Sequence, residues 1–197
     1  MPRIAPLPAS VLDDSHTQLL DKLNVLLGFE CNDWLTLAHV PPLMASAMSL
    51  CSSAIDAAED CGEDLRWLVC FASSRAFGCQ YCVAHSAYTA TRLGVPEAKL
   101  LDIDQYETSA AYSEPERAGI RVAIGMGTCP TSVKDADFDE LRKYFSESQI
   151  VALCGLSSMM GFFNRWNDAM ATELETPPKE NAALLLSSTG WSAGKHE

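Results

Sequence analysis

Glycine and proline residues divide this chain, from one end to the other, into segments whose apolar residues recur at helical spacing. No stretch alternates with the period of two that marks a half-buried strand. A chain without strands must bury its apolar stripes by packing helix on helix. The sequence therefore predicts an all-α helical bundle in one domain over residues 1–197, with its core at about 42–171 and a partly ordered C-terminal tail over 172–197.

Caps and breakers set the expected helix boundaries. Ser10 is a candidate N-cap, the Ser113 to Glu116 and Ser146 to Gln149 pairs read as capping boxes, and Gly78 interrupts two helical patterns. We expect helices over residues 11–27, 33–39, 41–60, 63–77, 79–93, 96–101, 114–126, 135–144 and 146–171. Leu19 and Leu23 lie on the apolar stripe of the first segment. We expect His16 and His39 to be ordinary surface or helix-end residues.

Composition limits the kinds of partner. A net charge of -12 repels phosphate backbones and anionic lipid, so we expect neither nucleic acid nor a membrane surface to bind. The N-terminus lacks the apolar segment of a secretory signal, and no apolar run approaches the roughly 20 residues of a membrane span. We therefore expect a cytoplasmic protein, in which most of the eight cysteines are small buried hydrophobes.

Cys79 and Cys82 form the one close cysteine pair, at the expected start of a helix, with His85 three residues further on. Side chains one turn apart are close enough to bridge, and the unpaired N–H groups of a helix start stabilise a thiolate. An imidazole at His85 can accept the thiol proton when neutral or hold the thiolate when cationic. The pattern indicates dithiol redox chemistry.

Other interpretations of the pair differ in strength. Attached haem c needs a histidine directly after the second cysteine, where Val83 stands, and a thioredoxin-like motif needs strands that this chain lacks. A zinc site at Cys79, Cys82 and His85 has no obvious fourth ligand, so we expect no metal. Packing of the three side chains at a helix contact, without chemistry, stays open.

These residues resemble a known family. The run from Ser74 and Arg75 through Gly78, Cys79, Cys82 and His85 to Gly94 is similar to the core of the carboxymuconolactone decarboxylase / AhpD-like family, the alkylhydroperoxidase group. The stretch from residue 135 to 168, with its Asn-Arg-Trp-Asn-Asp run, resembles the second half of the longer members. The similarity spans residues 65–175.

The resemblance implies an AhpD-like all-α fold, a homo-oligomer (a homodimer or a multiple of dimers) and, in the active members, a thiol peroxidase reaction of the peroxiredoxin type without a cofactor. Carried over, Cys82 attacks the hydroperoxide substrate, Cys79 resolves the sulfenic acid into a disulfide, and His85 handles the proton. An external dithiol reductant completes the cycle. We also expect Cys79, being nearer the helix start, to be the more exposed sulfur.

This chain departs from the best-understood members at two positions. Ser86 stands where they have the relay histidine, and Trp67 stands where they have a glutamate. A histidine at the position of His85 also occurs in a subset of the family, and Ser86 is close enough to hydrogen-bond the sulfur of Cys82. Slow or altered peroxidase activity is therefore expected.

Other residues can support the site. Asn164 and Asp168 share a helix face and Arg165 can pair with Asp168, which favours a buried polar cluster between helices or subunits. In the functional alternative, Asp168 replaces the missing glutamate and orients His85. The side chains Met159, Met160, Phe162 and Phe163 indicate core or a subunit interface.

Two further functions remain as alternatives. One is a non-catalytic helical oligomer with a structural or metal-binding cysteine pair, and the other is a relative of the lactone decarboxylases. Decarboxylating members lack the cysteine pair that this chain has at Cys79 and Cys82.

Overall fold

The computed structural model describes residues 1–12 and 14–197, apart from the side chains of residues 14–16, 19, 22, 23 and 26. All regular elements in these ranges are helical, which confirms the predicted all-α fold. The α-helices are α1 (Asp14–Leu27), α2 (Asn32–Leu37), α3 (Pro41–Ala57), α4 (Glu63–Phe77), α5 (Gln80–Arg92), α6 (Glu97–Leu101), α7 (Glu114–Gly127), α8 (Asp135–Leu141), α9 (Glu147–Met170) and α10 (Thr176–Leu185). Short 3-10 turns cover Ala9–Val11, Glu59–Cys61, Ile103–Gln105, Ser187–Thr189 and Gly194–His196.

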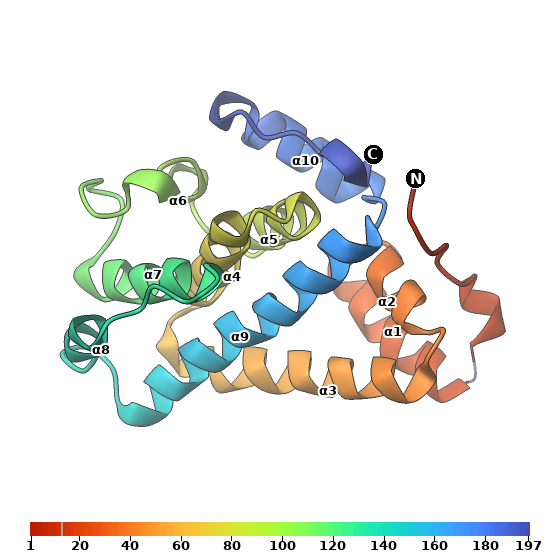
Figure 1. Ribbon diagram of the computed structural model, residues 1–197, viewed down its shortest axis with the longest axis horizontal. Helices are drawn as coiled ribbons and strands as arrows, with labels where there is room; N and C mark the ends of the chain where they lie inside the picture. The colour runs from red at the N-terminus through yellow and green to blue at the C-terminus, as the bar shows by residue number, and fades with distance from the viewer. Residues whose placement is uncertain (13) are drawn as a thin grey trace.

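Helices α4 and α9 organise the molecule. Helix α4 packs against α5, α7 and α9, and α9 also contacts α3, α5 and α7. Figure 1 shows α9 running diagonally across the bundle, with α1, α2 and the N-terminus at one end and α7 and α8 at the other. The largest fully buried side chains include Leu68, Phe71, Ile120 and Leu156, which come from α4, α7 and α9. The core therefore lies where these helices meet.

The expected start and stop signals act where the sequence places them. Gln149 donates its backbone N–H to Ser146 Oγ at 3.3 Å, and Ser146 returns its N–H to Gln149 Oε1 at 2.9 Å. Glu116 accepts the backbone N–H of Ser113 at 2.8 Å. Gly78 ends α4 in the left-handed conformation, with φ +90°. Most interior helices consequently lie within a few residues of the predicted ranges.

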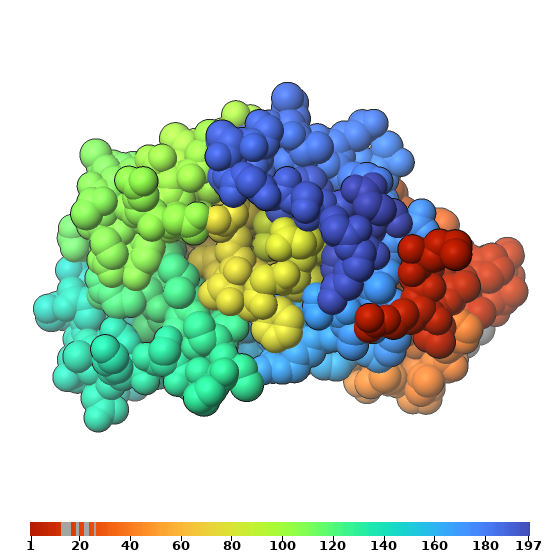
Figure 2. Space-filling view, turned by 45° about the horizontal axis from the view of Figure 1, so that its top comes forward, coloured from red at the N-terminus to blue at the C-terminus, as the bar shows by residue number. Residues whose placement is uncertain are grey.

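The two ends of the chain differ from expectation. The first α-helix begins at Asp14, after a 3-10 turn, so Ser10 does not cap it. The predicted contacts of Leu19 and Leu23 and the surface position of His16 lie outside the described side chains, whereas His39 is exposed as expected. The tail, expected to be only partly ordered, forms α10 and packs on α5. Figure 2 shows this C-terminal segment, in dark blue, along the yellow surface of α4 and α5.

None of the helices within the described ranges has both the length and the apolarity required to cross a membrane.

Substituting Gly78 tests the turn that separates α4 from α5, the helix that carries Cys82. A Cβ at this position meets no atom within 4 Å, so Gly78→Ala costs only the strain of a left-handed residue, roughly 1–2 kcal/mol. Gly155, exposed within α9 and equally free of neighbours, is the matched control, and Gly155→Ala should stabilise the protein by roughly 0.5–1 kcal/mol. Urea unfolding measures both. Equal changes in the two variants would contradict this role of the turn.

Candidate functional site

The turn between α4 and α5 positions both cysteines. Gly78 ends α4, and Cys79 then takes the extended conformation of an N-cap residue. Cys79 Sγ accepts the backbone N–H of Cys82 at 3.5 Å, so a sulfur stands where serine or aspartate usually caps a helix. The two cysteines are free thiols one helical turn apart. The predicted juxtaposition of Cys79 and Cys82 at a helix start is therefore present.

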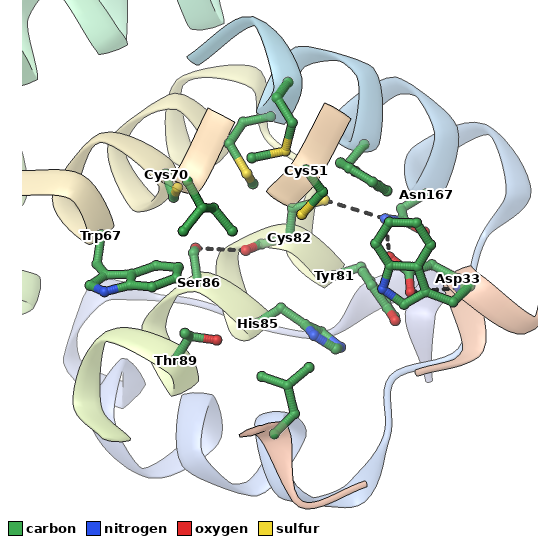
Figure 3. Close-up of a pocket in the computed structure, with 16 residues that line it drawn as sticks. Asp33, Cys51, Trp67, Cys70, Tyr81, Cys82, His85, Ser86, Thr89 and Asn167 are labelled. Atoms are coloured by element: carbon green, nitrogen blue, oxygen red, sulfur yellow. Dashed lines mark hydrogen bonds between the residues drawn. The ribbon is translucent and has the colours of Figure 1, made fainter. Parts of the chain in front are cut away.

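A cavity of about 140 Å³ opens beside Cys82. Cys82 lines this cavity and Cys79 does not. The other lining residues, many of them shown in Figure 3, are Leu27, Asp33, Trp34, Cys51, Ile55, Trp67, Cys70, Tyr81, His85, Ser86, Thr89, Met159, Met160, Phe163 and Asn167. Most of these side chains are apolar or aromatic, so the cavity suits a small apolar molecule with few polar groups.

His85 is held by a glutamate that the sequence analysis missed. Its Nε2 lies 2.6 Å from Glu175 Oε2, and its ring stacks on Tyr81 with centroids 4.2 Å apart. Glu175 Oε1 also accepts the Tyr81 hydroxyl at 2.9 Å and the Asn32 backbone N–H at 2.6 Å. Glu175 is the N-cap residue of α10, in the segment expected to be a loose tail. The only local sequence signal near Glu175 was the pair Pro177 and Pro178, since proline suits the first turn of a helix.

His85 and Glu175 form an ion pair. Burial alone would lower the pKa of His85, but the charge and hydrogen bond of Glu175 outweigh burial and raise that pKa above its ordinary value. Burial likewise favours a neutral Glu175, but the charge and hydrogen bond of His85 hold the pKa of this carboxyl below its ordinary value. The pairing therefore favours the cationic imidazole, whose Nε2 is occupied by Glu175.

The two thiols have opposite pKa shifts. The hydrogen bond from the Cys82 side chain and the backbone N–H groups of Cys82 and Tyr81 lower the pKa of Cys79, against the effect of burial. Burial, together with that hydrogen bond to Cys79, raises the pKa of Cys82. Asn167, from α9, opposes the increase by donating its amide N–H to Cys82 Sγ at 3.6 Å. Sequence reasoning included Asn167 only as part of a motif.

Ser86 and Trp67 stand where the best-understood family members have the relay histidine and a glutamate. Both residues line the cavity, but their side chains donate hydrogen bonds to groups other than the sulfur of Cys82. Ser86 Oγ donates to the carbonyl oxygen of Cys82 at 2.6 Å, so the expected hydrogen bond to the sulfur is wrong. A hydroxyl one turn along a helix bonds its own backbone readily, because that carbonyl lies directly within reach. Trp67 Nε1 donates to Glu63 at 3.0 Å, and its ring lines the cavity.

The predicted polar cluster on α9 does not form. Asp168 pairs with Lys195 at 2.7 Å, so the predictions that it pairs with Arg165 or orients His85 are wrong. Arg165 is exposed and donates to the Gly161 carbonyl at 3.1 Å. Asn164 is buried, and its side-chain amide has no hydrogen-bond partner among the described residues. Successive residues of a helix point about 100° apart, which directs Asn167 and Asp168 to different surroundings.

Exposure of the sulfurs also differs from expectation. Cys79 is 0% exposed and Cys82 is 3% exposed, so Cys79 is not the accessible member of the pair. The C-terminal segment, with α10 and the 3-10 turn Gly194–His196, packs against α5. Among the described residues, no group of three or more His, Cys, Asp or Glu side chains has the arrangement of a metal site.

Similarity to known proteins is found among solved structures. No protein-family model matches the chain, and no curated protein matches it. Among solved structures, the chain is 31% identical to the debrominase Bmp8 in its apo form, with a TM-score of 0.85 over 92% of this chain and 97% of that one. A cysteine-to-alanine variant of Bmp8 in complex with 2,3,4-tribromopyrrole matches equally well.

A third solved structure shows the fold at lower identity. It is described as an alkylhydroperoxidase AhpD core, an uncharacterized peroxidase-related protein from Ralstonia eutropha JMP134. The identity is 19% and the TM-score is 0.77, over 90% of this chain and 94% of that chain.

Replacing Glu175 tests the ion pair. In Glu175→Gln the burial of His85 is opposed only by the charge of Asp33, so the pKa of His85 should fall from its wild-type value in an NMR titration. The variant should lose roughly 1–3 kcal/mol of stability near pH 6, because a hydrogen bond to a charged group is weakened. Glu180→Gln, an exposed change on the same helix, is the control and should leave both values unchanged.

The loss of stability should depend on pH with a definite sign. The pair contributes most between pH 4.5 and 6.5, the ordinary values of the two groups. The contribution falls as pH rises from 6.5 through the raised pKa of His85, and as pH drops from 4.5 through the lowered pKa of Glu175. A difference between wild type and Glu175→Gln that is constant from pH 3 to 9 would argue against an ion pair.

Proposed function

The chain belongs to the AhpD-like (carboxymuconolactone decarboxylase-like) family, and on that premise we propose that it is a dithiol reductase in which Cys82 attacks a small substrate and Cys79 resolves the product into a disulfide. The observation that carries the proposal is the asymmetry of the pair at the cavity. Cys82 lines the cavity, whereas Cys79 is buried behind it. Of the two paired sulfurs, a substrate in the cavity therefore meets that of Cys82 and not that of Cys79.

The pKa order of the thiols fits these roles. The lowered pKa of Cys79 makes it the readier thiolate, but a nucleophile that no substrate reaches cannot take the first step. A thiolate beside Cys82 suits the second step, in which it attacks the modified sulfur of Cys82. Cys82 receives a hydrogen bond from Asn167 that stabilises its anion during the first step.

The reaction is a two-electron reduction. Cys82–SH and R–X give Cys82–S–X and R–H, and Cys79–SH then displaces X as HX and forms the Cys79–Cys82 disulfide. An external dithiol reduces the disulfide and is itself oxidised. With a hydroperoxide, X is OH and R–H is an alcohol, and with a halogenated ring X is the halogen and R–H is the dehalogenated ring.

The cavity favours a small halogenated aromatic ring as the substrate. Apolar cavities of about 150 Å³ hold a benzene ring, which is close to the 140 Å³ beside Cys82. Aromatic walls such as Trp34, Trp67 and Phe163 suit a flat apolar molecule. The similarity to the debrominase Bmp8 over 97% of its length supports the same substrate class.

An organic hydroperoxide is the second candidate, and a peroxidase of the peroxiredoxin type is the activity that the family resemblance implies. The free Cys79–Cys82 dithiol is the observation that favours it, because the same two thiols reduce a peroxide without any other group. The structures described as peroxidase-related share the fold at 18–19% identity.

Assembly into a homodimer or a multiple of dimers stays a prediction. Met159 and Phe163, for which the sequence indicated core or a subunit interface, are buried within the chain. Exposed apolar side chains at the start of α3 and along it, Val40, Leu43 and Leu50, are the better candidates for contact between copies. Light scattering at micromolar concentration should give a multiple of the chain mass, and a monomer would contradict the prediction.

Substitutions at the two cysteines test the proposed roles. Cys82→Ser should abolish consumption of both 2,3,4-tribromopyrrole and cumene hydroperoxide, because no nucleophile then lines the cavity at that point. Cys79→Ser should complete one turnover and stop with a sulfenic acid on Cys82, since either Cys82–S–Br after hydrolysis or direct oxidation by peroxide yields that group. Bromide release, peroxide loss and dimedone labelling with mass spectrometry measure the outcomes.

The exposed cysteine Cys129 provides the control, and Cys129→Ser should behave as wild type. A first turnover that survives in Cys82→Ser and disappears in Cys79→Ser would reverse the roles. A wild-type protein that consumes neither compound while keeping both thiols would favour the non-catalytic alternative.

A further inference from the structure

Asp33 is a buried carboxyl group that faces the same cavity as Cys82, and the reaction outlined so far does not use it. It lies in α2, is 7% exposed and lines the cavity. Its Oδ1 accepts the backbone N–H of Trp34 at 2.8 Å. Its Oδ2 lies 3.4 Å from Asn167 Nδ2. A carboxyl group buried at a cavity that receives a substrate needs a reason beyond packing, since burial disfavours its charge.

One amide group joins Asp33 to the thiol. Asn167 Nδ2 lies within 3.6 Å of both Cys82 Sγ and Asp33 Oδ2, as the dashed lines in Figure 3 show. The Thr172 hydroxyl donates to Asn167 Oδ1 at 2.8 Å, and this contact fixes the amide with its NH₂ group toward the sulfur and the carboxylate. The thiol and the carboxyl group therefore meet across a single donor at one end of the cavity.

Asp33 is surrounded by other titratable groups, and its own pKa lies close to neutrality. The titratable groups that act on it or lie beside it are Cys31 in its own segment, Cys51 on α3, Tyr81, Cys82 and His85 on α5, and Glu175 at the start of α10. Burial raises the pKa of each of these cysteines and of Tyr81, which stay protonated, while His85 and Glu175 contact each other at 2.6 Å. Burial also raises the pKa of Asp33, to about 6.

The negative charges of Asp33 and Cys82 disfavour one another. The Asp33 carboxylate is one of the causes that raise the pKa of Cys82, so a thiolate forms more easily when Asp33 is protonated. The two groups can share one proton. The proton is on Asp33 when Cys82 is a thiolate, and it is on the sulfur when Asp33 is a carboxylate. The thiol proton thus has an acceptor inside the cavity.

We propose that Asp33 is the proton carrier of the site, which accepts the proton of the Cys82 thiol and delivers it to the fragment that leaves when the sulfur attacks. This inference rests on the proposed function. In the first step the sulfur forms a bond to X, the R–X bond breaks with its electron pair going to R, and R takes the proton from Asp33. The products are Cys82–S–X and R–H, and Asp33 returns to its carboxylate form.

Both candidate substrates need this proton. A hydroperoxide releases an alkoxide, and a halogenated ring would release a carbanion, and neither forms readily in an apolar cavity. His85 is the other acid at the cavity, but its Nε2 is held by Glu175. Asp33 instead lies next to the amide that contacts the reacting sulfur.

The unmodified protein provides the first test, through two pH profiles between pH 6 and 9. Single-turnover consumption of 2,3,4-tribromopyrrole or cumene hydroperoxide should be independent of pH, because the population with the proton on Asp33 and not on Cys82 is constant between the two pKa values. Alkylation of Cys82 by iodoacetamide needs only a thiolate and should rise with pH. Turnover that rises tenfold per pH unit would overturn the proposal.

Asp33→Asn provides the second test because the two readouts should move in opposite directions. Single turnover at pH 7 should fall by about 100-fold or more, since the acid is lost, and should then rise with pH. Alkylation of Cys82 should be as fast as in wild type or faster, because a negative charge near the sulfur is gone. Asp139→Asn, an exposed change on α8, should alter neither rate.

The other outcomes each overturn a stated claim. If Asp33→Asn slows turnover and alkylation together, Asp33 only supports the structure, and if it changes neither, Asp33 is not involved. A flat turnover profile that survives in Asp33→Asn and disappears in His85→Gln assigns the proton to His85. A wild type that consumes neither probe overturns the proposed function and this inference with it, whereas an active wild type with an equally active Asp33→Asn overturns the inference alone.

Discussion

The carboxylate of Glu175 is the contact on which the arrangement of the site depends. It binds His85 and Tyr81 on α5 and the backbone N–H of Asn32 at the start of α2, and Glu175 itself occupies the N-cap position of α10. Three segments far apart in the sequence are thereby fixed around one buried charge. Since α2 carries Asp33 and α5 carries Cys82, the same contact also sets where the carboxyl group stands relative to the thiol. A charge of this kind tolerates burial only while its partners remain in place.

Local geometry separates the chemistry of two identical side chains. Cys79 takes the capping position, where backbone N–H groups stabilise an anion, and Cys82 lies one turn inside the helix, where burial dominates. The cavity reaches only the second of them. A C-x-x-C motif at a helix start thus yields one sulfur suited to meeting a substrate and one suited to meeting the other sulfur.

Much of the fold could be predicted from the sequence because its signals are local. Gly62 and Gly78 bound α4 at the predicted residues, and the Ser146 capping box opens α9 as expected. The first helix was placed too early, since residues 9–11 form a 3-10 turn instead. The order of the C-terminal tail was underestimated, because α10 is stabilised by packing on α5 and no local sequence pattern indicates that contact.

The site was only half predictable, for the same reason. Cys79, Cys82 and His85 are near one another in the sequence, and spacing alone brings them together. Their partners come from 85 to 90 residues away, Asn167 to Cys82 and Glu175 to His85, and Asp33 lies 134 residues from Asn167. Choosing Asp168 as the partner of His85 failed because a helix turns neighbouring residues toward different surroundings. Only tertiary packing decides which distant carboxylate reaches the imidazole.

The complete burial of Cys79 has a consequence for how the protein would cycle. A disulfide between Cys79 and Cys82 would expose no sulfur at the outer surface, so its reductant has to enter by the cavity that admits the substrate. Substrate and reductant then use the same opening of the cavity in turn, and each must leave before the other enters. Such a protein follows ping-pong kinetics, and an excess of substrate slows it by keeping the reductant out.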